Sequence, residues 1–156
     1  MVRLRDGFTL VETMLVVVII GIITIFALPS LNRGSDSKSV KGGMNSIIAE
    51  LSVAKTAAIT RGRCATVHLN SSGSLWVTTA LCGGSPIDTL TTRNLSTAYG
   101  VTTTACTGSS CTLGTALDYA FDPRGIPYAG NGATYVITKG AAADTVTVGT
   151  FGRFTR

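Results

Sequence analysis

The chain has 156 residues and a formal net charge of +5, and only 13% of its residues are charged. This length fits one domain with an appendage, and the low share of charged residues argues against long disordered tails. A single histidine and four cysteines exclude most histidine-based metal and triad chemistry. The positive charge gives a weak attraction to polyanions and identifies no function by itself.

Residues 8–29 form an apolar stretch whose only polar residues are Glu12 and three threonines. As a helix the stretch would be roughly 30 Å long, which is the thickness of a bilayer's hydrocarbon core. Arg3 and Arg5 precede it, and such basic flanks stay in the cytoplasm. The pattern therefore predicts one membrane-spanning helix. A cleaved secretory signal is the alternative, but its apolar stretch is shorter and residues 27–30 match its cleavage site poorly.

The start of this stretch, Gly7-Phe8-Thr9-Leu10-Val11-Glu12, resembles the type IV prepilin motif. The resemblance implies that prepilin peptidase removes residues 1–7 as a leader by cutting between Gly7 and Phe8. It also implies that Phe8, the new N-terminus, is methylated. Glu12 would then act in assembly, because a carboxylate inside an apolar bundle needs a cation and a neighbouring subunit's α-amine supplies one. The sequence therefore predicts a cleavage site, an N-methylation site and an assembly residue.

Residues 30–63 are predicted to form a linker followed by an amphipathic helix. The polar residues 30–37 suggest a break after the apolar stretch. From residue 39 to residue 61, apolar residues recur at steps of three and four, which is the spacing of one helix face. This face consists of Val40, Met44, Ile47, Ile48, Leu51, Ala54 and Ala58. We expect it to pack on a β-sheet.

Residues 64–156 are predicted to form a β-rich globular domain. Residues 64–69 and 75–79 alternate in polarity around a turn at residues 70–73, which predicts a hairpin. Further strands are expected at three places, and no element is predicted for residues 80–117. Those three strands cover residues 118–121, 134–138 and 145–148. The expected fold class is therefore α+β, with a long N-terminal helix packed on an antiparallel sheet.

The globular part resembles the GspH/FimT family, which contains minor pseudopilins of type II secretion and minor pilins of type IV pili. The resemblance rests on residues 54–62, the hairpin, Phe121-Asp122-Pro123-Arg124-Gly125 and the closing Gly152-Arg153. It implies the type IV pilin fold and a non-enzymatic filament subunit without a cofactor. The implied location is the inner membrane, crossed once, with the C-terminal domain in the periplasm. The implied partners are prepilin peptidase, other pilin subunits and the inner-membrane assembly platform. The sequence leaves the pilus role and the secretion role open.

Four cysteines lie on the side of the chain predicted to be periplasmic: Cys64, Cys82, Cys106 and Cys111. An even number of cysteines in an oxidising compartment favours disulfides, and four cysteines allow three pairings. We expect a Cys106–Cys111 bridge, which closes a small loop, together with a Cys64–Cys82 bridge. A zinc site is the alternative, but the spacing matches one poorly, so no metal is expected.

The C-terminal residues place two arginines, Arg153 and Arg156, around the aromatic Phe154. Arginines near a chain end suit phosphate contacts, and bases can stack on an aromatic ring, so these residues are a DNA-binding candidate. Some FimT-like minor pilins carry a terminal G-R-x-R element that binds DNA during uptake, and here one more residue separates the arginines. A solvated chain end is the alternative. No catalytic set is found, since His68 has no nucleophile at catalytic spacing.

Overall fold

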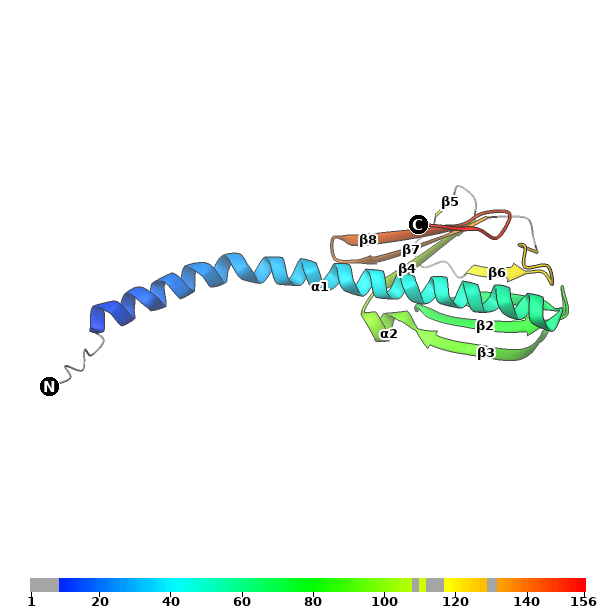
Figure 1. Ribbon diagram of the computed structural model, residues 1–156, viewed down its shortest axis with the longest axis horizontal. Coiled ribbons are helices and arrows are strands. Elements are labelled where there is room, and N and C mark those ends of the chain that lie inside the picture. The colour runs from blue at the N-terminus through cyan, green and yellow to red at the C-terminus, as the bar shows by residue number, and fades with distance from the viewer. Residues whose placement is uncertain (1–8, 108–109, 112–116, 129–131) are drawn as a thin grey trace, which may run out of the picture. The chain divides into compact units, whose positions relative to one another are not determined.

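The computed structural model describes residues 9–107, 110–111, 117–128 and 132–156, without the side chains of residues 25–33, 107 and 110–111. The chain divides into two compact units, one ending at Ser35 and the other beginning at Asp36. Among the described residues, every strand belongs to the second unit, as the order of elements in Figure 1 shows.

The first element, helix α1, runs without interruption over Leu10–Arg61 and contributes to both units. The break that the sequence predicts over residues 30–37 is therefore wrong. A proline inside a helix removes one backbone N–H donor, and the turns on both sides of Pro29 supply the remaining hydrogen bonds. Gly34 does not take the positive φ that would end a helix. The predicted amphipathic helix is confirmed as the second part of α1.

A four-stranded sheet in the second unit has the order β3-β2-β1-β6. Its strands are β1 (Cys64–Leu69), β2 (Ser74–Ala80), β3 (Pro86–Asn94) and β6 (Leu117–Phe121). The predicted hairpin is confirmed, because β1 and β2 pair antiparallel from Cys64–Ala80 to Leu69–Leu75. Gly73 closes its turn with a φ of +79°, a conformation that favours glycine.

A second, five-stranded sheet has the order β5-β4-β7-β8-β9, whereas the sequence predicts one sheet. Its strands are β4 (Thr102–Thr107), β5 (Ser110–Cys111), β7 (Ala133–Lys139), β8 (Ala142–Val148) and β9 (Phe154–Thr155). The predicted pair of strands near the C-terminus is confirmed as the β7–β8 hairpin. The short helix α2 (Leu95–Tyr99) joins the two sheets, and Asn94 caps it by accepting a hydrogen bond from the N–H of Thr97.

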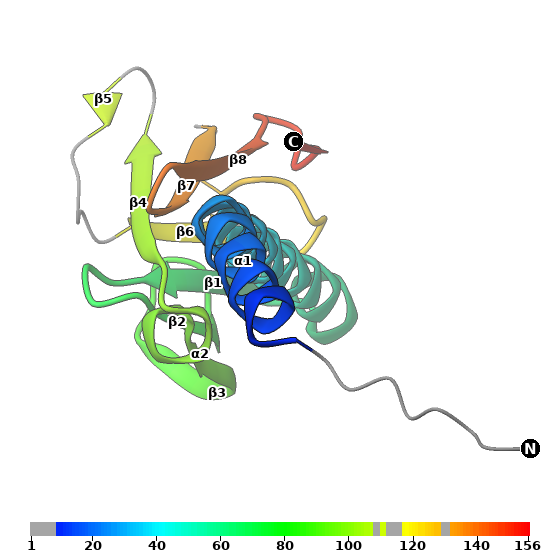
Figure 2. The same cartoon turned by 90° about the vertical axis from the view of Figure 1, so that its left-hand side faces the viewer.

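The core forms where the second part of α1 packs on both sheets. In Figure 2, β2 and β3 lie on one side of the helix and β7 and β8 lie on the other. The apolar face of the helix is fully buried at Met44, Ile47 and Leu51. Glu50 is also buried, and it is neutralised by Arg93 of β3 at 2.8 Å. The sheets therefore bury the predicted helix face and hold the helix by an ion pair as well.

Candidate functional site

The N-terminal end of α1 is fixed by Thr9. The backbone N–H of Glu12 lies 3.3 Å from the Thr9 hydroxyl, and its hydrogen bond to the Thr9 carbonyl is 3.1 Å long. Threonine at this position satisfies N–H groups that the first helical turn would otherwise leave unpaired. Gly7 and Phe8 lie outside the described residues, so cleavage and methylation there stay predictions.

The first part of α1, residues 10–24, exposes apolar side chains all round the helix. Its large apolar residues are between 44% and 76% exposed. They are Leu10, Val11, Met14, Leu15, Val16, Val17, Val18, Ile19, Ile20, Ile22 and Ile23. Glu12 is the only charged residue among residues 10–24, and it is exposed too. An apolar surface of this extent marks an interaction with lipid or protein.

Within the part of the chain that the structure describes, no helix includes an apolar stretch of sufficient length to cross a lipid bilayer. Residue 8 and the side chains of residues 25–29, which belong to the predicted membrane-spanning segment, lie outside the described residues.

Several hydroxyl groups on α1 are satisfied by the helix itself. Thr13 donates to the carbonyl of Leu10 at 2.8 Å, and Thr24 donates to that of Ile20 at 2.7 Å. Ser52 and Thr60 in the second part make the same kind of bond. Because these hydroxyls already have acceptors, they can enter an apolar interface without a polar partner. Both parts of α1 are therefore suited to contact with another apolar surface.

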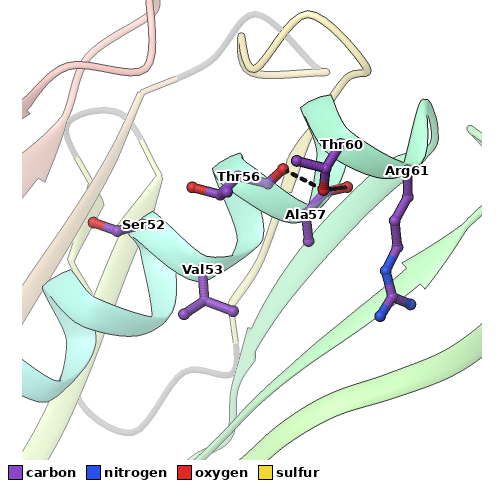
Figure 3. Close-up of a pocket in the computed structure, with 6 residues that line it drawn as sticks. All are labelled: Ser52, Val53, Thr56, Ala57, Thr60 and Arg61. Carbon is purple, nitrogen blue, oxygen red and sulfur yellow. Dashed lines mark hydrogen bonds between the residues drawn. The ribbon is translucent and has the colours of Figure 1, made fainter.

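A shallow groove of about 430 Å³ lies along one flank of α1 near its C-terminal end. Figure 3 shows the six side chains that line it, from Ser52 to Arg61. Arg61 is held at one end of this groove by Asp88 of β3, at 2.7 Å. Val53 is 39% exposed within the groove. This flank carries small side chains, and Arg61 is its only charge.

The structure contains a disulfide between Cys64 and Cys82, which joins the start of β1 to the loop after β2. Cys106 is disulfide-bonded as well. Cys111 is opposite Cys106 in the β4–β5 register. The side chain of Cys111 is not described, so the Cys106–Cys111 bridge stays a prediction.

The C-terminal arginines and Phe154 do not form a shared surface. Phe154 packs against the core, with the Lys55 ammonium 5.9 Å from its ring centroid. Arg156 pairs with Asp144 of β8 and also donates to the Asn45 side chain at 3.3 Å. Arg153 is exposed, and no residue in the described ranges bonds its side chain. No local pattern in the sequence points to Asp144, because twelve residues separate it from Arg156 and only the β8–β9 pairing brings the two together.

His68 belongs to a hydrogen-bonded row on the face of the four-stranded sheet that points away from α1. Its Nδ1 lies 2.7 Å from Asp118, and its Nε2 lies 2.8 Å from the Thr78 hydroxyl. Its ring also stacks on Trp76 at 5.0 Å. The order Asp–His–Thr resembles a nucleophile triad, but Thr78 is only 5% exposed, so a substrate cannot reach it. The row therefore fits a structural role across β6, β1 and β2.

A long N-terminal helix, apolar and exposed in its first part and packed on antiparallel sheets in its second, is the type IV pilin fold. The family model described as the prokaryotic N-terminal methylation motif matches residues 3–28.

Two crystal forms of the type IV minor pilin FimU of Pseudomonas aeruginosa are similar in structure to this chain. The first has a TM-score of 0.59 and 16% identity, and the match covers 76% of this chain and 87% of FimU. The second has a TM-score of 0.56 and 16% identity, and the match covers 74% of this chain and 90% of FimU. The comparison with curated proteins finds no match. These findings establish the pilin fold and the methylation motif.

Proposed function

We propose that the chain is a minor subunit of a filament of the type IV pilus class, made as a precursor and cut by prepilin peptidase. The observation that carries the proposal is the exposed apolar surface of residues 10–24, which lies within the residues that match the methylation motif. Such a surface has to be covered, and a bundle of like helices covers it on all sides. Phe8 is then the methylated first residue of the mature chain.

Before assembly, residues 8–29 anchor the chain in the inner membrane and the second unit lies in the periplasm. Arg3 and Arg5 support this orientation, because basic flanks stay in the cytoplasm. The Cys64–Cys82 disulfide supports it too, since disulfides persist in oxidising compartments such as the periplasm. The partners in this state are the peptidase and the inner-membrane assembly platform.

In the filament, Glu12 takes the α-amine of a neighbouring subunit's Phe8 as its partner. Glu12 is the only charge between residues 10 and 24, so an apolar bundle would leave its carboxylate unpaired without such a cation. In a bundle of parallel helices a neighbour's Phe8 amine can lie level with Glu12 after a small axial shift, because the two positions are only about one helical turn apart along the chain.

A role in a pilus is preferred over a role in a secretion pseudopilus, because FimU, whose fold the chain shares, is a type IV minor pilin. DNA binding is the second candidate, and the exposed Arg153 and the net charge of +5 favour it. It ranks lower because Arg156 is paired with Asp144 and Phe154 is packed against the core.

The proposal is tested by tagging the second unit and shearing surface filaments from cells that carry a complete pilus assembly system. The tagged chain should appear in the sheared fraction at a small fraction of the major pilin. In cells that lack the assembly motor it should remain in the membrane fraction. A chain that stays in the membrane fraction of both strains would refute the subunit role.

A further inference from the structure

The large apolar side chains that stay exposed on the second unit gather at the end where α1 finishes. Among the described residues of this unit they are between 39% and 79% exposed. They are Val53, Ile59, Leu81, Ile87, Tyr128 and Phe151. Two belong to the last third of α1, and the other four lie in or beside the loops that Figure 1 shows around the C-terminal end of this helix. We call this set the apolar end.

Contacts between α1 and two of these loops hold one side of the apolar end together. Gly125, in the turn after β6, lies against the Ile59 side chain. Gly152, the neighbour of Phe151, lies against the Gly125 carbonyl, and its own carbonyl accepts a hydrogen bond from Lys55 at 3.1 Å. The β8–β9 loop and the turn after β6 are therefore fixed to the helix.

The loop between β2 and β3 continues this surface on the other side. Gly83 lies beside the Tyr128 hydroxyl, so this loop contacts the segment that follows β6. Asp88, next to Ile87, pairs with Arg61 of α1 at 2.7 Å. Because all these segments contact one another or the same helix, the apolar end is one continuous surface of the kind that marks a protein interface.

Two arginines at the border of the apolar end have no partner. Arg63 follows α1 directly, and Arg153 follows the β8–β9 loop. Both are exposed, and within the described ranges no residue forms an ion pair or a side-chain hydrogen bond with either. The C-terminal carboxylate belongs to Arg156, whose side chain bonds Asp144 and, further back along α1, Asn45. The border therefore presents free positive charge.

The second unit of another copy of this chain has no free acidic side chain to match that border. Each of its acids is already held by a lysine, arginine or histidine of the same chain. These acids are Asp36, Glu50, Asp88, Asp118, Asp122 and Asp144. An apolar surface bordered by arginines is complemented by an apolar surface bordered by carboxylates. The matching surface therefore belongs to a different protein.

We propose that the apolar end binds the globular domain of a different subunit of the same filament, through an apolar patch bordered by carboxylates. This inference rests on the filament role proposed above and adds a contact outside the helix bundle. A bundle that gathers the helices of several subunits also holds their globular domains at a high effective concentration. Leu81, Tyr128 and Phe151 form the apolar centre of the contact, and Arg63 and Arg153 pair with the partner's carboxylates. The contact thus selects which subunit the chain lies beside.

The test places a photoreactive benzoylphenylalanine at Phe151 or at Tyr128, because both are exposed aromatic residues. The tagged full chain is irradiated in cells that carry a complete pilus assembly system, and sheared filaments are analysed by mass spectrometry. Both positions should crosslink to the same, different filament subunit. The same probe at Ala98, which is exposed on α2 outside the apolar end, should give that product at no more than about a tenth of the yield.

Variants then test what holds the contact. Arg63→Ala combined with Arg153→Ala should lower the yield of the Phe151 crosslink about tenfold. Lys38→Ala combined with Lys41→Ala is the matched control, since it also removes two exposed positive charges but near the start of the second unit, and it should leave the yield unchanged. Leu81→Ser should lower the yield without changing the unfolding temperature, because Leu81 is 65% exposed.

The outcomes separate this contact from the filament role. Crosslinks only to a second copy, only to DNA or to nothing, in a chain that is present in sheared filaments, would overturn the contact and leave the filament role intact. Equal yields from Ala98 and Phe151, or equal losses in the two double variants, would overturn it as well. A chain that is absent from sheared filaments in every version, including the wild type, would refute the filament role itself.

Discussion

The two parts of α1 differ in what can cover their apolar side chains. The second part buries its apolar face against two sheets of its own chain, with Met44, Ile47 and Leu51 fully covered. The first part carries apolar residues on every side, and its large side chains are at least 44% exposed. An amphipathic helix can be completed by its own domain, whereas a helix that is apolar all round needs lipid or other chains. The second part of α1 therefore contributes to the folding of its own chain, whereas the first part is left to contact lipid or other chains.

The largest effect is expected at Glu12. Glu12→Val should leave membrane insertion intact and remove the chain from sheared filaments, because the neighbour's buried amine would lose its partner. Leaving one charge of a buried pair alone costs about 3–5 kcal/mol. Thr13→Val is the matched control, since the Thr13 hydroxyl bonds its own helix and needs no neighbour. Filament entry by Glu12→Val at the wild-type level would contradict the role proposed for this residue.

The next effect distinguishes the two parts of the helix by stability. Leu51→Ala opens a cavity under both sheets and should lower the free energy of unfolding of the second unit by about 2–5 kcal/mol. Val17→Ala, in the first part, should leave that free energy unchanged, because Val17 is 68% exposed. Denaturant titration of the full chain in detergent, followed by Trp76 fluorescence, measures both. Equal losses would mean that the first part also packs within its own chain.

Much of the second unit follows from the sequence because its patterns are local. The steps of three and four from Val40 to Ala58 predict the buried helix face, and alternation predicts the β1–β2 hairpin. The sequence does not predict strand β3. Its pairing with β2 shifts register between Val77 and Thr78 and again between Thr79 and Ala80. These irregularities break the alternation that identifies a strand.

The candidate sites were predictable only where they depend on adjacent residues. Gly7, Phe8 and Glu12 form a contiguous motif, so the sequence alone singles them out. The pairing of Arg156 with Asp144 and Asn45 depends on β9 folding back along β8, and no local pattern encodes it. The predicted break over residues 30–37 is wrong for the opposite reason. The proline and the polar residues that follow it are a local signal for a break, but helix α1 continues through them because it is helical on both sides.

Removing the observed disulfide should have a moderate effect confined to the second unit. The bridge closes a sequence separation of 18 residues, so replacing Cys64 and Cys82 by serine should cost about 3 kcal/mol. The physical reason is the larger conformational freedom of the unfolded chain. Thermal unfolding of the double variant against the wild type under non-reducing conditions measures it. An unchanged midpoint would show that the bridge does not constrain the unfolded state.

The turn after β6, which contains Asp122, should make the free energy of unfolding depend on pH in the acidic range. Burial acts to raise the pKa of the Asp122 carboxyl, but hydrogen bonds from Ile126 and Arg124 outweigh it, so the pKa is lowered. A lowered folded pKa gives stability that is present above the unfolded value of about 4 and is lost as pH falls through the folded value. Asp122→Asn should therefore lose about 1–3 kcal/mol at neutral pH and show a weaker acid dependence. Identical pH profiles for both proteins would contradict this.

The smallest effect concerns DNA. Replacing Arg153 and Arg156 by alanine removes two positive charges, as does replacing Lys38 and Arg63. Non-specific DNA binding in the range of about 10⁻⁴–10⁻⁶ M depends on total charge, so diffuse attraction predicts equal losses in fluorescence anisotropy at fixed salt. A localised site predicts a clearly larger loss for the arginine pair. Because Asp144 already engages Arg156, we expect the two losses to differ by less than about tenfold.

The proposed filament role depends most directly on the N-terminus of the mature chain. Intact-mass spectrometry of the protein extracted from membranes of cells with active prepilin peptidase should show the loss of residues 1–7 and one added methyl group on Phe8. The same chain from cells without the peptidase should keep the leader, and Gly7→Ala should be processed poorly. A chain that keeps its leader in the presence of active peptidase would contradict the proposed filament role.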